Sequence, residues 1–119
     1  MRKVNCAALA AVDTSSQNGA QLDTNQWVSA SFHAVFGDST AAGTVKLQAS
    51  NDIFLDQYQP GNFTVTNWVD LPNQSATITS GAPAILTVAQ CAYRWMRVVY
   101  TSTSGGSSTV TVNVFALSV

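Results

Sequence analysis

The sequence predicts an all-β protein built as a two-sheet antiparallel sandwich, on three observations. Apolar and polar residues alternate with a period of two along most of the chain, as they do in half-buried strands. The sequence contains no glutamate and only 5 Lys and Arg, so strong helix formers are scarce. Gly, Pro, Asn and Asp separate the alternating runs at short intervals. Its 119 residues fit one domain, 1–119.

The clearest strand is 27–36, in which apolar side chains recur at every second position. Its inward face would consist of Val28, Ala30, Phe32, Ala34 and Phe36. Its outward face would carry Trp27, Ser29, Ser31 and His33. The run 44–50 alternates in the same way after a short Gly-containing loop, so we expect the two runs to form an antiparallel hairpin.

The remaining strands are predicted from the same alternation and from the turn formers between them. Pro72-Asn73 and Ser80-Gly81 should be turns, and Gly105-Gly106 should turn 93–101 back into the last strand. The run 93–101 is apolar on both faces and should be central. The other expected strands are 4–12, 63–69, 76–79, 85–88 and 109–119. The total of about eight short strands favours a jelly roll.

The predicted core gathers the apolar residues of these strands. It consists of Val28, Phe32, Phe36, Val45, Leu47, Trp95, Val98, Val112 and Val114.

The N-terminus can be interpreted in two ways. Arg2 and Lys3 precede a short apolar run, as in a signal peptide, but Asn5 interrupts that run and a first β-strand is the preferred interpretation. No stretch approaches the roughly 20 apolar residues of a membrane span. Without an export signal, Cys6 and Cys91 are expected to stay reduced rather than to form a disulfide.

Charge is scarce and balanced. Charged residues make up 9% of the chain and the formal net charge is -1. Such a chain has no basic field to hold nucleic acid or an anionic membrane, so neither is an expected partner. A neutral surface rich in Ser and Thr suits a protein that is packed among neighbours.

The sequence predicts no enzyme active site, no cofactor site and no metal site. His33 is the only histidine, and nothing marks the activated serine or oriented carboxylate that a triad needs. Most of the aspartates stand beside turn formers, where they stabilise turns. Asp52 and Asp56 could share a calcium ion with loop carbonyls, but no EF-hand pattern is present.

Aromatic and basic residues supply the candidate partner-binding residues, which are Trp27, His33 and Arg97. Trp27 lies on the polar face of its strand and is expected to be exposed, as it would be in a sugar-stacking platform. Arg94 and Arg97 fall on opposite faces of a central strand. One of them should pair with an aspartate, with Asp70 the natural choice, and the other could point to a partner protein.

Three segments together resemble a known class of virion protein. They are GTVKLQASND at 43–52, NWVDLP at 67–72, and YRWMRVVYT at 93–101 before the Ser/Gly-rich tip. In this order, within residues 27–119, the chain resembles the jelly-roll decoration, or cement, proteins of tailed bacteriophages. The resemblance implies the major capsid protein as partner, a homodimer, assembly in the bacterial cytoplasm and a place on the capsid surface. It supplies no catalytic residue.

Two alternatives stay open at this point. Similar sandwiches occur in phage head or tail fibres that bind glycans or receptors, so carbohydrate is a second possible ligand. For the homodimer, either the run ending at Val119 or the run 4–12 could be the sheet edge that meets a second copy.

Overall fold

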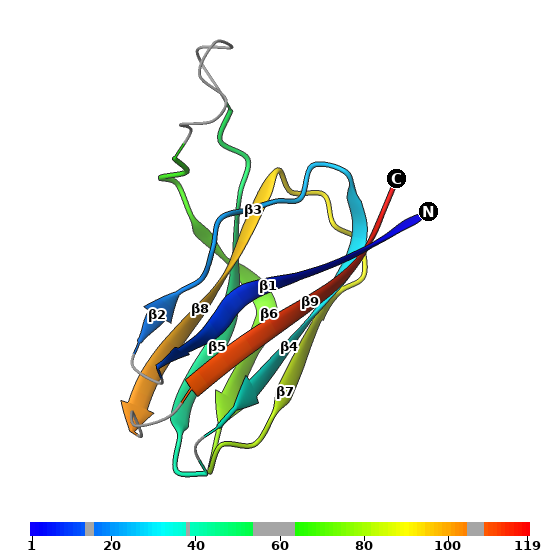
Figure 1. Cartoon of the computed structure of the whole chain (residues 1–119). Helices are drawn as coiled ribbons and strands as arrows, with labels where there is room; N and C mark the ends of the chain where they lie inside the picture. The colour runs from blue at the N-terminus through cyan, green and yellow to red at the C-terminus, as the bar shows by residue number, and fades with distance from the viewer. Residues whose placement is uncertain (14–15, 38, 54–63, 105–108) are drawn as a thin grey trace.

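The computed structural model describes residues 1–13, 16–37, 39–53, 64–104 and 109–119, with the backbone alone for 10–13 and 104. These residues form nine strands (Figure 1). The strands are β1 (Arg2–Asp13), β2 (Gln17–Asn18), β3 (Leu22–Asp23), β4 (Trp27–Phe36), β5 (Ala42–Ser50), β6 (Val69–Ile78), β7 (Ala84–Val88), β8 (Trp95–Ser104) and β9 (Thr109–Ser118). No helix that could span a membrane occurs in the described part of the chain.

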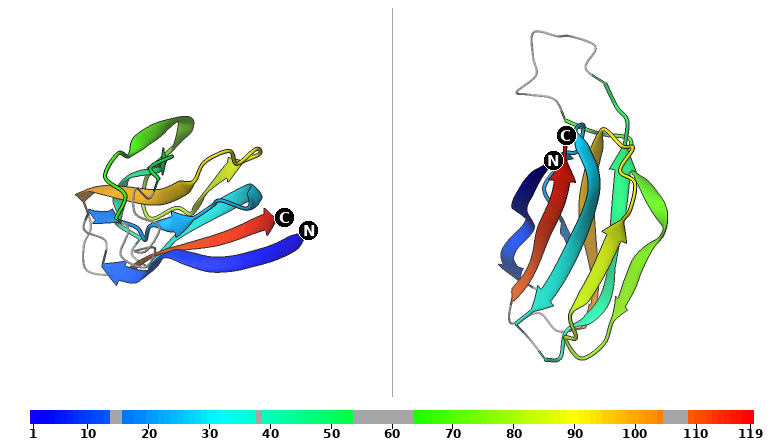
Figure 2. Two further views of the ribbon diagram at one scale, coloured as in Figure 1. Left: turned by 90° about the horizontal axis from the view of Figure 1, so that it is seen from above. Right: turned by 90° about the vertical axis from the view of Figure 1, so that its right-hand side faces the viewer.

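The strands build two antiparallel sheets that pack face to face (Figure 2). The first sheet has the order β1-β9-β4-β7, and the second has the order β2-β8-β5-β6, with β3 also paired to β8. If β2 and β3 are counted as two halves of one strand, the first strand pairs with the eighth, the second with the seventh, the third with the sixth and the fourth with the fifth. This nested pairing is a long hairpin folded over on itself, the jelly roll that the sequence predicted.

Both hairpins predicted from neighbouring strands are wrong. β4 pairs with β7 and β9, whereas β5 pairs with β6 and β8, so the two strands lie in opposite sheets. β8 and β9 are likewise in opposite sheets, and the Gly105-Gly106 tip lies outside the described residues. In a jelly roll most connections cross between the sheets, so sequence neighbours are seldom paired.

The predicted turn at Pro72-Asn73 is a bulge within one strand. β6 runs through it, and the pairing with β5 steps from Lys46–Ser75 to Gln48–Asp70. The extra residues 71–74 therefore stand opposite Leu47 alone. Asn73 has a φ of 61°, a left-handed conformation that asparagine tolerates better than most residues. Residues 64–68 form no strand, and Phe63 lies outside the described residues.

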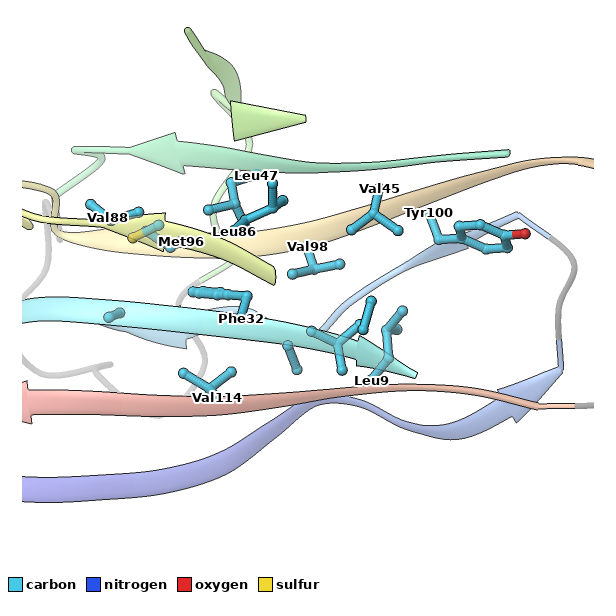
Figure 3. Packing of buried hydrophobic residues seen from close by; sticks show 14 of the residues in the cluster. Leu9, Phe32, Val45, Leu47, Leu86, Val88, Met96, Val98, Tyr100 and Val114 are labelled. Carbon is cyan, nitrogen blue, oxygen red and sulfur yellow. The ribbon is translucent and has the colours of Figure 1, made fainter. Parts of the chain in front are cut away.

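The core lies between the sheets and confirms most of the predicted set (Figure 3). The buried residues that were predicted are Phe32, Val45, Leu47, Trp95, Val98, Val112 and Val114. Phe36 is half-buried and packs on the cluster, with its ring 5.3 Å from that of Tyr100. Val28 is half-buried and does not belong to the cluster, so its assignment to the core was wrong.

Side chains and short segments close both seams between the sheets. At one seam, the Nε2 of Gln74 in β6 donates to the carbonyl of Thr87 in β7 at 2.9 Å. At the other, Gly19 donates to the carbonyl of Val98 at 2.7 Å and Ala20 to that of Ala8 at 2.9 Å. The first half of β1 lies beyond this second closure and pairs only with β9.

The sheet order shows which of the two candidate strands for pairing with a second copy is an edge strand. β9, which carries the run ending at Val119, lies between β1 and β4 and is not an edge strand. β1 is an edge strand, as expected for the run 4–12. The chain termini lie side by side at its open end, because Arg2 pairs with Ser118 (Figure 1).

Candidate functional site

The outer face of the first sheet carries no charged side chain over three of its four strands. β4, β7 and β9 contain no Lys, Arg, Asp or Glu. Val35, Ile85 and Phe115 are exposed there by 40%, 62% and 42%. Because burying a hydroxyl or an apolar group costs far less than burying a charge, this face can be covered by a protein at little cost. We call it the uncharged face.

His33 lies on the uncharged face, as predicted from the alternation of its strand. It is exposed, and its cross-strand neighbours are Asn113 in β9 and Ile85 in β7. Neither neighbour is a carboxylate that could orient an imidazole. The next row places Ser31 between Thr87 and Phe115.

Sequence reasoning missed the large exposed residues of this face. Phe115 occupies an outward position of a strand whose inward valines are Val110, Val112 and Val114, so the alternation alone could have identified it. Phe115 and Leu117 also line a shallow hollow of about 210 Å³ beside Ser29 and Ser31.

Trp27 does not lie on the outer face, contrary to the prediction. The β4–β9 ladder slips by one residue between Trp27 and Ser29, so Trp27 stands opposite Ser118. Ser118 is buried and falls in the inward series of β9. The bulge turns Trp27 to the same side, where the ring is half-buried and packs against the core. Trp27 is therefore no exposed sugar platform.

Arg97 lies on the outer face of the second sheet, the opposite side of the sandwich from His33. Its Nε donates to the Oε1 of Gln48 at 2.8 Å, and its guanidinium carbon lies 4.5 Å from the centre of the Trp68 ring. Burial lowers the pKa of Arg97. Neither Arg97 nor Arg94 pairs with Asp70 in the described part of the chain, so the choice of Asp70 as the partner of one of the two arginines was wrong.

Asp70 instead binds two residues of β5. The Nε2 of Gln48 donates to Asp70 Oδ1 at 2.8 Å, and the Nζ of Lys46 lies 3.1 Å from Oδ2. The hydrogen bond from Gln48, and secondarily that from Lys46, lower the pKa of this carboxyl. Gln48 therefore lies between Arg97 and Asp70 and is hydrogen-bonded to both. The cation that pairs with Asp70 is Lys46.

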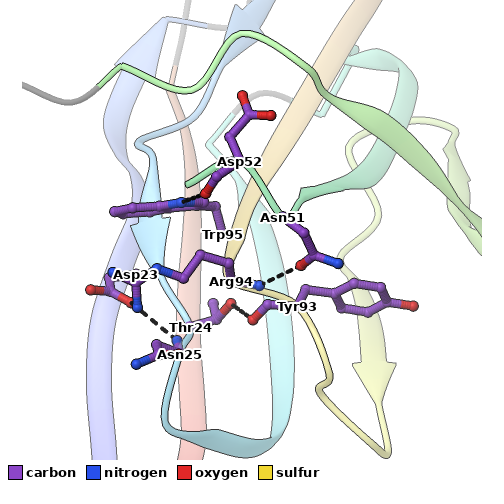
Figure 4. A network of polar contacts seen from close by, with 8 residues as sticks. All are labelled: Asp23, Thr24, Asn25, Asn51, Asp52, Tyr93, Arg94 and Trp95. Carbon is purple, nitrogen blue, oxygen red and sulfur yellow. Dashed lines mark hydrogen bonds and ion pairs between the residues drawn. The ribbon is translucent and has the colours of Figure 1, made fainter. Parts of the chain in front are cut away.

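Arg94 is the arginine that pairs with an aspartate, but the aspartate is Asp23, with the Nη1 of Arg94 3.5 Å from its Oδ1. The guanidinium carbon lies 5.0 Å from the centre of the Trp95 ring. The backbone N–H of Arg94 donates to Asn51 Oδ1 at 2.9 Å, and Trp95 Nε1 donates to the carbonyl of Asp52 at 3.1 Å (Figure 4). This network ties the ends of β3, β5 and β8 together.

Asp52 joins the two ends of the segment that follows β5 through hydrogen bonds to its carboxylate, which we call the Asp52 clasp. Its Oδ2 accepts the backbone N–H groups of Thr66 and Asn67 at 3.0 and 3.1 Å, and its Oδ1 accepts Asn67 Nδ2 at 3.0 Å. These hydrogen bonds, that of the Asn67 side chain first, lower the pKa of Asp52. Within the described ranges, no three His, Cys, Asp or Glu side chains gather as metal ligands, and Asp56 lies outside those ranges.

An open groove of about 550 Å³ lies between this clasp and the bulge of β6. Tyr93, Asn51, Asp52 and Asp70 contribute aromatic and polar groups to its walls, and Leu71 contributes an apolar one. No local pattern in the sequence predicts this groove, because its walls come from three separate segments.

The two cysteines are free thiols, as predicted. Cys6 and Cys91 are both half-buried, and burial raises the pKa of each. The Sγ of Cys91 lies 3.6 Å from the Sδ of Met96.

Comparison with known proteins shows the fold. No family model and no curated protein matches the sequence. Among solved structures, the crystal structure of the SPBc2 prophage-derived protein YomS resembles this chain with a TM-score of 0.61 at 13% sequence identity. The match covers 98% of this chain and 94% of that one, so the whole sandwich is shared.

Proposed function

We propose that this protein is a phage virion structural protein that decorates and stabilises the capsid by bridging subunits of the major capsid protein. It would be made in the bacterial host cytoplasm and end on the capsid surface, acting by binding rather than by catalysis. The observation that carries the proposal is the uncharged face, with Val35, Ile85 and Phe115 exposed among hydroxyl and amide side chains.

Three further observations support a phage origin. The fold is a jelly roll, an architecture common in viral capsid proteins, although fold does not fix function. It is shared along its full length with a protein whose name marks it as prophage-derived. The sequence resemblance to decoration proteins supports the same assignment.

Physically, a bridge stabilises a shell by mass action. A protein that binds adjacent subunits of the assembled shell, but not the separated subunits, shifts the equilibrium towards the assembled state. Even a modest interface gives a large total effect when it is repeated over many copies. An uncharged contact surface would also make this binding tolerant of high salt.

The test uses phage particles made with the wild-type gene, without it, or with the double variant I85K/F115K. Both side chains are exposed, so the variant should fold, and two buried lysines should abolish binding to the shell. Ala82→Lys, at an exposed position in the turn between β6 and β7 and on neither sheet face, is the matched control. We expect regular density on shells for wild type and A82K only, and loss of DNA on heating without the protein. Equal occupancy by I85K/F115K would refute the uncharged face as the contact.

The groove beside Tyr93 favours a second candidate, a glycan- or receptor-binding module of a head or tail fibre. An aromatic ring flanked by Asn and Asp side chains is a suitable lining for a sugar. Titration of host polysaccharide into wild type and Tyr93→Ala by calorimetry tests it. Binding that Tyr93→Ala removes, with the protein located on fibres and absent from shells, would replace the capsid assignment.

A further inference from the structure

Two arginines of this chain are stacked on tryptophans, and they differ in one respect. Arg94 lies over Trp95 and also has a carboxylate, that of Asp23, at 3.5 Å. Arg97 lies closer to its ring, 4.5 Å from the centre of Trp68, and no carboxylate pairs with it in the described part of the chain. Arg94 therefore has both a tryptophan ring and a carboxylate as partners, whereas Arg97 has the ring but no carboxylate among the described residues.

In the part of the chain that the structure describes, Arg97 is held in a fixed orientation without an ion pair. Its Nε is used by Gln48, and the Gln48 amide is oriented in turn by its donation to Asp70. Asp70 does not pair with Arg97 directly, and its two oxygens accept from Gln48 and Lys46 instead. One face of the guanidinium is covered by Trp68. Among the described residues, the two terminal nitrogens of Arg97 have no hydrogen-bond partner.

A guanidinium in this state is prepared for an external anion. Its planar fork can donate two parallel hydrogen bonds to one carboxylate. The entropy of ordering the long side chain has already been lost on folding, so less is lost on binding. Arg and Trp are also the residue types that contribute most to binding at protein interfaces.

We propose that Arg97, stacked on Trp68 and oriented by Gln48, is a receptor for an Asp or Glu carboxylate of a partner protein. This inference rests on the proposed function for the partner's identity as a capsid subunit, and it deepens that function. A bridging protein needs two contact surfaces. Arg97 lies on the outer face of the second sheet, opposite the uncharged face, and supplies the second contact.

The surrounding charges favour a carboxylate over a phosphate. Asp70, with its side chain 58% exposed, lies two strands across the second sheet from Arg97, on the far side of Gln48. Lys46 is the nearest described cation of the network and is already paired with Asp70. A single arginine beside an aspartate can neutralise one negative charge, but a doubly charged phosphate would be repelled by the carboxylate.

The experiment follows the Nε–H signals of Arg97 and Arg94 by NMR in the purified full chain. The probe is an acetylated and amidated Ala-Glu-Ala peptide, with Ala-Gln-Ala as the uncharged match and sodium chloride at equal ionic strength. We expect saturable shifts at Arg97 with the Glu peptide only, and none at Arg94. Arg97→Lys, which keeps the charge but loses the fork, should bind roughly tenfold more weakly, since one charge-assisted hydrogen bond is lost.

Two controls separate the outcomes. Gln48→Leu removes the orienting acceptor while leaving Arg97 and Trp68, and should weaken binding in a protein that remains folded by circular dichroism. Inorganic phosphate and glucuronate test the other anions. No shift with the Glu peptide, equal shifts with the Gln peptide, or tighter binding of phosphate or glucuronate would overturn the proposal. The particle experiment on the uncharged face does not depend on this result, so the two proposals can fail separately.

Discussion

Trp27 pairs with Ser118 across the β4–β9 ladder, one residue out of step with the Ser29–Leu117 pair beside it. This single slip decides that the largest side chain of β4 packs inward. A one-residue change of register moves a side chain to the other face of a sheet, and here it does so locally.

Replacing Trp27 by Ala should therefore destabilise the fold rather than remove a ligand contact. We expect a loss of about 2 kcal/mol in the free energy of unfolding, less than the 3–5 kcal/mol typical of a fully buried tryptophan, because the ring is half-buried. Urea denaturation measures it. His33→Ala, at an exposed position, should change stability by less than about 0.5 kcal/mol. Similar losses for both variants would contradict the inward placement of Trp27.

Gly43 allows β5 and β8 to approach closely. A Cβ at this position would lie 2.2 Å from the carbonyl oxygen of Thr101, so the backbones must separate to admit one. Gly43→Ala should cost about 1–3 kcal/mol of stability through this strain. Gly19→Ala, where the nearest backbone oxygen is at 2.8 Å, should cost less. The thermal midpoints of the two variants check the order, which a larger loss in Gly19→Ala would reverse.

The Asp52 clasp should make the fold sensitive to acid. Its pKa is lowered in the folded state, so its contribution to stability is present above the unfolded pKa of about 4 and is lost as the pH falls through the folded pKa. Thermal midpoints measured from neutral pH down to strong acid should fall more steeply for wild type than for Asp52→Asn. Parallel profiles would show that the carboxylate contributes nothing that depends on its charge.

Both thiols should react slowly in the native protein. Burial raises the pKa of Cys6 and of Cys91, so little of either is the reactive thiolate at neutral pH. We expect slow modification by a thiol-specific reagent in buffer, fast modification of both in urea, and no change of intact mass on reduction. Fast native reaction of either would show that its sulfur is more open than the structure has it.

The first half of β1 should pair with a second copy, joining two first sheets into one. It is an edge strand that pairs only with β9, and such edges readily accept another strand. Light scattering should give the mass of a dimer. Asn5→Lys, an exposed position on this edge, should give a monomer of unchanged stability. A monomeric wild type at high concentration would refute the predicted homodimer.

The sequence by itself determined most of the strands and most of their inward residues. Period-two alternation is a local property, so Phe32, Val45 and Val112 could be assigned to the core without knowledge of their partners. Scarce helix formers and frequent turn residues were enough for the sandwich class, and the strand number and spacing favoured the jelly roll.

Only the tertiary structure decided which strands are neighbours. The jelly roll pairs β1 with β9 and places β4 and β5 in opposite sheets, so pairing depends on residues distant in sequence. Trp27 faces inward because of its pairing with β9. Asp70 binds Lys46 and Gln48 rather than Arg97, which has no carboxylate partner among the described residues. Local patterns specify which side of a strand is apolar, but hydrogen bonds between distant strands set the register and hence the surroundings of each polar side chain.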